Sequence, residues 1–296
     1  MPAWLGQDES MQAIRVRALS KTYSDKSSGK KIAVDSLDLD VQTGEIFALL
    51  GPNGAGKTTT VEILEGYRDR DSGEVSVLGK DPGALGAGER SWRNSIGIVL
   101  QSTNDAMDLS VHETISHFSH YYSNPRNPEE VIRAVGLEEK SAAKVRSLSG
   151  GQRRRLDVAL GIIGRPEILF LDEPTTGFDP EARRSFWELI RELKNSGTTI
   201  LLTTHYLDEA EALADRVAVI VNGSIIEVAT PATLGGRNTA QARITWLENG
   251  SLQEISTDNP TSEVKKLSER FGGEVPELRV LRPTLEDIYL SMIGAS

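Results

Sequence analysis

The sequence contains no cysteine among its 296 residues. Disulfide bonds, thiolate zinc sites and a cysteine nucleophile are therefore excluded, and the absence fits a reducing compartment. Basic residues are also in deficit, with 33 Lys and Arg against 43 Asp and Glu and a formal net charge of −10. This balance argues against a nucleic-acid-binding protein with a globally basic surface and against a polybasic membrane anchor. A local basic pocket stays compatible with it.

Long hydrophobic runs are missing as well. Stretches such as Val217–Val221 and Ile168–Leu171 are short, whereas a membrane-spanning helix needs about 20 apolar residues. The N-terminal sequence MPAWLGQDES lacks the basic and apolar blocks of a signal peptide. We therefore expect a soluble intracellular protein, unless a partner holds it at a membrane. Hydrophobic residues still make up 38% of the chain, which is enough for a sizeable core.

Strand-like and helix-like segments alternate along much of the chain, which is typical of a parallel sheet covered on both faces. We predict an N-terminal tail at 1–11, a main α/β domain at 12–235 with an antiparallel β edge, and a small α+β appendage at 236–296. A helical segment at about 102–163 interrupts the main domain. The strand-like runs of that domain are Ala13–Leu19, Ala33–Val41, Glu45–Leu50, Glu74–Leu78, Ile96–Leu100, Ile168–Leu171, Thr199–Thr203 and Arg216–Val221.

A glycine-rich segment carries the strongest local signal. Residues 51–58 read GPNGAGKT and fit G-x-x-x-x-G-K-[S/T] between a predicted strand and a predicted helix. Glycines let the backbone wrap a polyphosphate, with N–H groups and the positive helix end facing it. Lys57 adds a full charge and Thr58 can bind Mg²⁺. An ordinary glycine-rich turn is the alternative, which the strand–loop–helix context disfavours. The predicted nucleotide-binding residues are Gly51, Pro52, Asn53, Gly54, Ala55, Gly56, Lys57, Thr58 and Thr59.

Two carboxylates follow a hydrophobic strand. The run ILFL ends in Asp172 and Glu173, and ligands of open α/β sheets bind at the carboxyl ends of the strands. Asp172 can hold Mg²⁺ together with Thr58, and Glu173 can polarise the attacking water. Alone, such a pattern is more often a helix cap or a solvated loop. Together with the phosphate loop, it indicates a nucleoside triphosphatase.

A second glycine-containing segment narrows the class of triphosphatase. Residues 148–152 read LSGGQ and come before Asp172 in the chain. A serine and two glycines at a helix N-terminus expose N–H donors to an anion, although a lone SGGQ also occurs as a flexible turn. In this order, the three motifs resemble those of the ATP-binding cassette (ABC) family, and the resemblance covers residues 12 to about 235. It implies that ATP contacts Ser149, Gly150, Gly151 and Gln152.

The resemblance implies roles for further residues. Tyr23 matches the aromatic residue that stacks on adenine, although alone it would more often pack at a strand end. Gln101 matches the glutamine that reaches Mg²⁺ and water, and His205 matches the histidine that contacts the γ-phosphate. Asp179 matches the loop that crosses between two protomers, where the family more often has leucine at the place of Phe178. The implied catalytic residues are Glu173, His205 and Gln101, and the implied metal ligands are Thr58, Gln101 and Asp172.

One copy of each motif implies a second cassette. Mg·ATP carries about two net negative charges, of which one lysine and one helix end offset only about 1.5. The family arrangement places each ATP between the phosphate loop of one chain and the LSGGQ segment of another. We therefore expect activity only as a homodimer or beside a second cassette, with ATP and Mg²⁺ as cofactors and no nucleic acid as partner. The remaining histidines, which could be read as a metal cluster but are favoured as surface residues, are His112, His117 and His120.

The C-terminal sequence indicates the direction of transport. Arg282–Tyr289 reads RPTLEDIY and resembles ABC-2 exporters of the daunorubicin-resistance type, its alternative being a capped amphipathic helix. This implies an ATPase subunit at the cytoplasmic face of the membrane, powering a separate permease that exports drugs or other hydrophobic compounds. A soluble cassette ATPase acting on ribosomes or DNA usually has two cassettes or a long coiled-coil insertion. A kinase or GTPase is disfavoured by the LSGGQ match.

Overall fold

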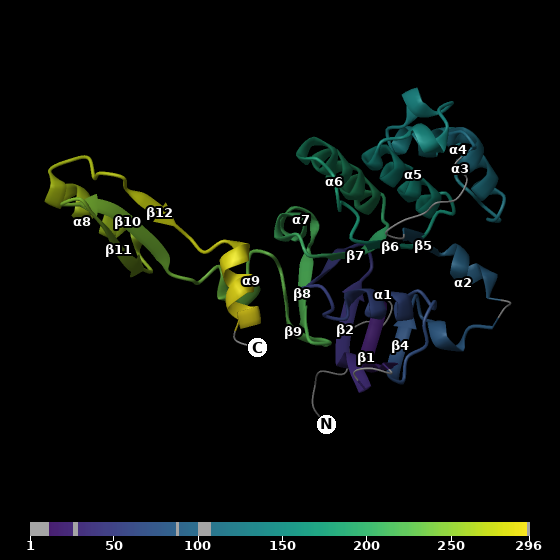
Figure 1. Cartoon of the computed structure of the whole chain (residues 1–296), viewed down its shortest axis with the longest axis horizontal. Helices are drawn as coiled ribbons and strands as arrows, with labels where there is room; N and C mark the ends of the chain where they lie inside the picture. Colours follow the sequence, from purple (N-terminus) through teal and green to yellow (C-terminus); the bar gives the residue numbers. More distant parts are fainter. Residues whose placement is uncertain (1–11, 26–28, 87–88, 100–107, 295–296) are drawn as a thin grey trace. The chain divides into compact units, whose positions relative to one another are not determined.

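The structure is a computed structural model that describes residues 12–25, 29–86, 89–99 and 108–294. Its contacts divide the chain into two units, Met1–Val228 and Ala229–Ser296. Each unit has its own strands (Figure 1). Each also has its own cluster of buried apolar residues. In the described ranges, no helix is both long enough and apolar enough to cross a bilayer.

A six-stranded sheet forms the centre of the first unit. Its order is β5 (Ile96–Val99), β6 (Ile168–Asp172), β7 (Thr199–Thr204), β3 (Ile46–Leu50), β8 (Arg216–Val221) and β9 (Ser224–Ala229). The first five of these are parallel. Strands β3 and β7 are buried along their whole length, which explains their continuous apolar or threonine-rich sequences. Asn222 and Gly223, both with positive φ, form the tight turn into β9.

An antiparallel sheet lies beside the central one. It has the order β2 (Gly29–Gln42), β1 (Gln12–Asp25) and β4 (Ser72–Val77). Alternate apolar residues of these strands, such as Val16 and Leu39, join Phe47 and Phe170 of the central sheet in one core. Strands β1 and β2 are longer than the runs predicted for them, because they continue as a paired ribbon past Leu19.

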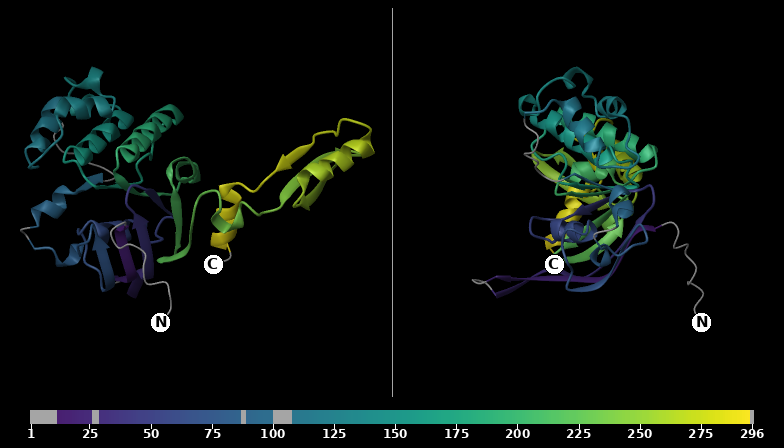
Figure 2. Two further views of the ribbon diagram at one scale, coloured as in Figure 1. Left: turned by 180° about the vertical axis from the view of Figure 1, so that it is seen from behind. Right: turned by 90° about the vertical axis from the view of Figure 1, so that its right-hand side faces the viewer.

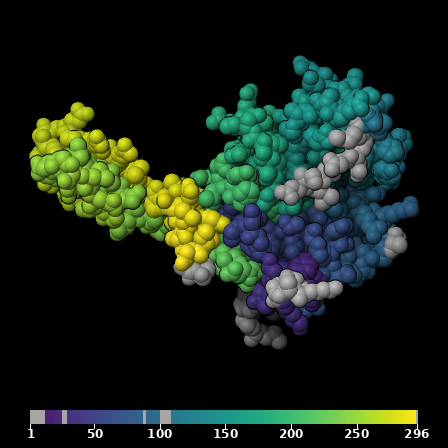
Figure 3. Space-filling view, viewed as in Figure 1, coloured from purple at the N-terminus to yellow at the C-terminus, as the bar shows by residue number. Residues whose placement is uncertain are grey.

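Helices complete the first unit. They are α1 (Lys57–Leu64), α2 (Arg90–Asn94), α3 (Val111–Ser119), α4 (Pro128–Ala134), α5 (Gly150–Ile162), α6 (Pro180–Asn195) and α7 (Leu207–Leu213). Single-turn 3₁₀ helices lie at Pro82–Ala84, Glu138–Lys140 and Val145–Ser147. Helices α3, α4 and α5 contact one another and are the teal group that lies away from the antiparallel sheet in both views of Figure 2. The same separation is visible on the surface in Figure 3.

Polar capping residues set where several of these helices begin. Ser110 and Glu113 form a reciprocal capping box at α3, and Ser149 and Gln152 form another at α5. Asp179 caps α6, whose first residue is proline. These caps are readable in the sequence as Ser-x-x-Glu, Ser-x-x-Gln and Asp-Pro, so the helix starts follow from local hydrogen bonding.

The second unit is a small α+β structure. An antiparallel sheet has the order β11 (Ser251–Thr257), β10 (Ala242–Glu248) and β12 (Arg279–Leu281). The unit also contains the helices α8 (Pro260–Phe271) and α9 (Leu285–Gly294). Ile244, Trp246, Leu267 and Val275 form its core. The α/β fold class predicted from the sequence, with its helical segment, antiparallel edge and α+β appendage, is confirmed.

The division between the units falls at 228/229, before the boundary predicted at 235/236. A 3₁₀ turn at Leu234–Gly236 explains this position. A Cβ added at Gly235 would lie 2.4 Å from the Ile288 side chain of α9. The side chain of Arg237 also donates to the carbonyl of Pro283 at 3.1 Å. The turn thus packs with the C-terminal helix.

Candidate nucleotide-binding site

The glycine-rich segment leaves the carboxyl end of β3 and enters α1. Gly56 has a φ of +106°, in the left-handed region that favours glycine. A Cβ at this position would lie 2.3 Å from the carbonyl oxygen of Ala33, and one at Gly51 would lie 2.3 Å from that of Ile220. The loop therefore needs glycine at both places, because backbone from neighbouring strands approaches it closely.

Lys57 lies inside this loop. Its Nζ atom donates to the carbonyl oxygens of Gly51 at 2.8 Å and Pro52 at 3.2 Å, and the residue is 5% exposed. Burial lowers the pKa of Lys57, while the charges of Glu173 and Asp172 oppose that change. A buried ammonium group bonded to neutral carbonyls gains from an arriving anion. The loop thus fits a polyphosphate.

A cavity of about 200 Å³ opens over the loop. Its described lining is Tyr23, Lys31, Ala33, Asn53, Gly54, Gly56, Lys57, Thr58, Thr59 and Glu173. Tyr23 is placed by β1, and its hydroxyl lies 3.3 Å from Thr59 Oγ1. The sequence prediction missed Lys31 and Ala33. Lys31 is the cross-strand partner of Tyr23 in the ribbon of β1 and β2, so only the strand register could have found it.

The end of β6 supplies the predicted metal-binding acid. Thr203 donates its hydroxyl to Asp172 Oδ1, and Asp172 Oδ2 lies 3.5 Å from Thr58 Oγ1. Within the described part of the chain, no three His, Asp or Glu side chains cluster in a way that could hold a metal. A lone carboxylate with a hydroxyl suits Mg²⁺, which usually keeps several waters and takes further oxygens from substrate phosphates.

Glu173, the next residue, faces two basic side chains. Its Oε1 atom lies 3.2 Å from His205 Nδ1 and 4.0 Å from Lys57 Nζ. Its φ of +43° is rare for a residue with a side chain, and its backbone N–H donates to the Thr203 carbonyl at 3.2 Å. The arrangement places a half-buried carboxylate beside an imidazole at the edge of the cavity, which suits proton abstraction from a water molecule.

The LSGGQ residues and Asp179 lie apart from this group. Neither Ser149–Gln152 nor Asp179 is in the described lining of the cavity. Ser149 and Asp179 serve as helix caps, and Asp179 accepts from the Ala182 N–H at 2.8 Å. Gly150 is exposed, and a Cβ there would meet nothing within 4 Å. The packing of this chain therefore does not require glycine at 150. The predicted role of Gln101 falls on a residue outside the described ranges.

The three helical-segment histidines have separate partners. His112 pairs with Glu129 at 3.0 Å, and His117 bonds to the Tyr121 hydroxyl at 3.1 Å. His120 lies 2.7 Å from the carbonyl oxygen of Ser116. These contacts fit surface histidines and give no support to a shared metal.

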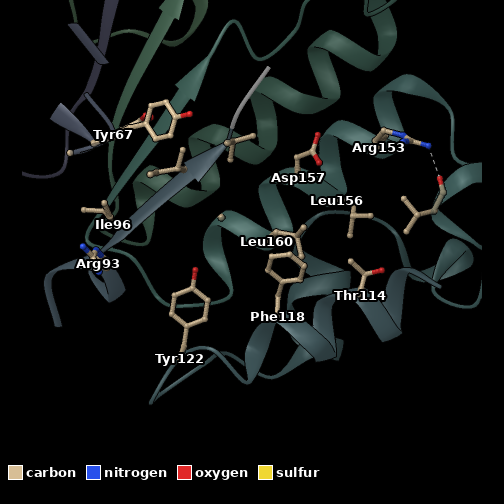
Figure 4. A pocket seen from close by; sticks show the side chains of 16 residues that line it. Tyr67, Arg93, Ile96, Thr114, Phe118, Tyr122, Arg153, Leu156, Asp157 and Leu160 are labelled. Carbon is tan, nitrogen blue, oxygen red and sulfur yellow. Dashed lines mark hydrogen bonds between the residues drawn. The ribbon is translucent and has the colours of Figure 1, made fainter. Parts of the chain in front are cut away.

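A second, larger cavity of about 490 Å³ lies between the helical segment and the central sheet (Figure 4). Its apolar lining includes Ile96 of β5, Phe118 of α3 and Leu156 of α5. Charged residues of both signs also line it, namely Glu65, Arg93, Arg153 and Asp157. Burial, with smaller effects from Asp172 and Glu62, raises the pKa of Glu65 to about 8.

Comparisons with known proteins show which family the chain belongs to. A family model described as ABC transporter matches residues 34–176. A Nod factor export ATP-binding protein I from Rhizobium sp. (strain N33) is 37% identical over 292 residues, covering 91% of this chain and 94% of that protein. The same-named protein of Neorhizobium galegae is 42% identical, covering 95% and 85% respectively.

A solved structure shows the same fold over most of this chain. The dimeric structure of a post-hydrolysis state of the ATP-binding cassette MJ0796, bound to ADP and Pi, has a TM-score of 0.66 and 24% identity. The match covers 73% of this chain and 98% of the MJ0796 chain. The relatives match nearly the whole chain, and the phosphate loop and its neighbouring acids are present. The chain therefore belongs to the ATP-binding cassette family and is an ATP-binding protein of the ABC transporter type.

Proposed function

We propose that this chain hydrolyses ATP as the nucleotide-binding subunit of an ABC exporter and drives a separate transmembrane permease. The observation that carries the hydrolysis is the position of Glu173, whose carboxylate faces His205 beside a cavity lined by the phosphate loop. Glu173 takes the proton of the attacking water, and His205 orients that carboxylate and reaches the γ-phosphate.

The remaining predicted residues surround the nucleotide. Lys57 and the backbone of the loop hold the phosphates, and Tyr23 stacks on the adenine. Thr58 and Asp172, with Gln101, would hold Mg²⁺, which would neutralise charge that develops on the phosphates. The approach of Thr58 to Asp172, at 3.5 Å, supports this metal site.

A second protomer completes the site. Ser149–Gln152 and Asp179 lie outside the cavity of their own chain, and the exposed Gly150 leaves room for a group from outside. N–H donors at the start of α5 would then meet the γ-phosphate held by the partner. The dimeric MJ0796 cassette, bound to ADP and Pi, supports such an arrangement. Homodimerisation, or pairing with another cassette, follows for this chain.

The permease contacts the larger cavity between the helical segment and the sheet. Ile96, Phe118 and Leu156 give it apolar walls that suit a short apolar segment of a partner chain. This contact would place the chain at the cytoplasmic face of the membrane. The export names of the relatives favour a transporter over the ribosome- or DNA-directed alternative. These names give Nod factor as the cargo of the relatives. For this chain, the proposal of drug export rests on the resemblance of Arg282–Tyr289 alone.

Substitution of Glu173 tests the hydrolytic role. We expect Glu173→Gln to bind ATP normally and to slow turnover by roughly 10²-fold or more, because the amide cannot accept the proton. Phosphate release and ATP binding are measured on the same preparation. Glu192→Gln, at an exposed position of α6, is the matched control. Normal turnover by the Glu173 variant would remove this residue from the role of base.

A further inference from the structure

A buried carboxylate that takes no part in the proposed chemistry connects the two segments that carry Glu173 and His205. Glu209 lies in α7, which begins shortly after His205, and is 0% exposed. Thr175 lies shortly after Glu173 and is also 0% exposed. The Thr175 hydroxyl donates to Glu209 Oε1 at 2.8 Å. One buried hydrogen bond therefore joins the segment after β6 to the segment after β7.

Polar and charged groups from several elements surround this carboxylate. Burial raises the pKa of Glu209, while Thr204, Thr175, Trp187 and the charge of Arg183 oppose the rise. These groups come from β7, α6 and the segment after β6, so three elements converge on one side chain. A buried carboxylate is costly unless hydrogen bonds satisfy it, and the Thr175 hydroxyl supplies the bond to Oε1. Loss of that hydroxyl would leave Oε1 without this donor.

A residue of α6 packs against the start of α7, next to His205. The Arg183 guanidinium pairs with Asp208 at 2.8 Å and lies 4.7 Å from the centre of the Tyr206 ring. The Tyr206 ring in turn lies 4.1 Å from the His205 ring. The position of His205 thus depends on how the start of α7 is fixed, and Glu209 is the part of α7 that reaches back to Thr175.

The Glu173 end is a short turn. The Thr175 carbonyl accepts from Phe178 at 3.1 Å, and Arg154 of α5 donates to the carbonyl of Pro174 at 3.0 Å. Glu173 itself has a φ of +43°, a conformation that persists only when its surroundings hold it. The anchored side chain of Thr175 is one such restraint, close to Glu173 in the chain.

We infer that Glu209 is a positioning residue, which keeps the Glu173 carboxylate and the His205 imidazole in register through its bond to Thr175. This inference rests on the proposed ATPase function. Glu209 is not in the described lining of the nucleotide cavity, so we expect nucleotide affinity to change little when it is replaced. Loss of the bond lets the two catalytic groups separate, and small misplacements of reacting groups lower turnover strongly.

The test measures kcat and KM for ATP with the full chain. We expect Thr175→Val to lower kcat by about tenfold or more while KM stays within about twofold, and Thr175→Ser, which keeps the hydroxyl, to restore kcat. Glu209→Leu should lower kcat similarly, and the double variant should be no worse than either single one. The matched control is Thr199→Val, since Thr199 is equally buried and bonds to Gly44 N at the opposite end of β7.

The possible results distinguish a failure of the proposed ATPase function from a failure of the role inferred for Glu209. A wild-type chain that hydrolyses no ATP, alone or with its permease, overturns the proposed function and this inference with it. Normal turnover of Thr175→Val beside an active wild type overturns only the inference. Additive losses in the double variant, or equal changes in kcat and KM, would also overturn it by indicating a general structural effect. Should Glu209→Leu fail to fold, the contrast of Thr175→Val with Thr175→Ser decides.

Discussion

Lys57 is buried, and its hydrogen-bond acceptors carry no charge. Its ammonium group bonds to two neutral carbonyls and stands 4.0 Å from Glu173. Because a charge-assisted bond to phosphate is stronger than a bond to a carbonyl, we expect Lys57→Ala to weaken ATP binding by about 1.5–3 kcal/mol, or roughly 10- to 100-fold. Equilibrium titration with ATP measures this. Lys265→Ala, at an exposed site in α8, is the control, and unchanged affinity of the Lys57 variant would contradict the phosphate cradle.

Glu65 makes stability depend on pH. Its pKa is about 8 in the folded chain against an ordinary value of 4.5, mainly because it is buried. Below pH 4.5, both states are protonated and the contribution of Glu65 to stability is fully present. As pH rises toward 8, only the unfolded chain ionises, so the free energy of unfolding falls by up to about 1.4 kcal/mol per pH unit.

We therefore expect Glu65→Gln to flatten this decline between pH 5 and pH 8, since glutamine does not titrate. Urea unfolding at several pH values, in buffer without nucleotide or Mg²⁺, measures the slope. Glu192→Gln should keep the wild-type slope, because that residue is exposed. An unchanged slope in the Glu65 variant would show that this carboxyl ionises normally in the folded chain.

At the scale of single elements, α5 offers two glycines in opposite environments. A Cβ at Gly150 meets nothing within 4 Å, whereas one at Gly161 lies 2.9 Å from Val99 and 3.1 Å from Leu169. We expect Gly150→Ala to leave the free energy of unfolding within about 0.5 kcal/mol of wild type but to lower turnover by roughly tenfold or more. The methyl group would hold the partner's nucleotide away from the N–H donors.

Gly161→Ala is the complementary control. It should lower the free energy of unfolding by about 1–3 kcal/mol, because the added methyl group overpacks the contact of α5 with the sheet. Thermal or urea unfolding, together with ATPase assays, distinguishes the two variants. Wild-type turnover in Gly150→Ala would argue that nothing from a second chain packs against the start of this helix.

Local sequence patterns predicted much of the fold. The continuous apolar run Ile168–Leu171 predicts a strand that is covered on both faces. The structure has β6 at this run. Strand β11 was not predicted, since its sequence SLQEIST is exposed or half-buried throughout and lacks a clear alternation. It is a strand because it pairs along its length with β10. Such pairing is a long-range property that a window of sequence does not contain.

The same distinction applies to the candidate site. The phosphate loop is one contiguous motif, and Asp172 and Glu173 form another. Each motif can therefore be recognised within a short stretch of sequence. Lys31 enters the cavity only through the register of two long strands. Glu209 meets Thr175 across two segments that follow different strands of the parallel sheet. Neither contact could be derived without the strand order.

For the whole molecule, the separation of the LSGGQ segment from the phosphate loop's cavity predicts that activity depends on association. At low protein concentration, each chain offers ATP only its own loop, so the γ-phosphate lacks the donors at the start of α5. We expect the ATPase rate per chain to rise with protein concentration and then to level off as dimers fill. A dilution series of steady-state rates measures this.

Trapping the dimer gives the sharpest form of this prediction. In Glu173→Gln, ATP binds but is cleaved very slowly, so the closed pair should accumulate on adding ATP and Mg²⁺ and disperse when ATP is removed. Light scattering coupled to gel filtration measures the mass of each state. Adding Lys57→Ala to the same chain should raise the ATP concentration needed for the dimer by roughly 10- to 100-fold, because the nucleotide that joins the two surfaces is held more weakly. Full turnover by a chain that stays monomeric at every concentration would mean that one protomer supplies all the donors the γ-phosphate needs.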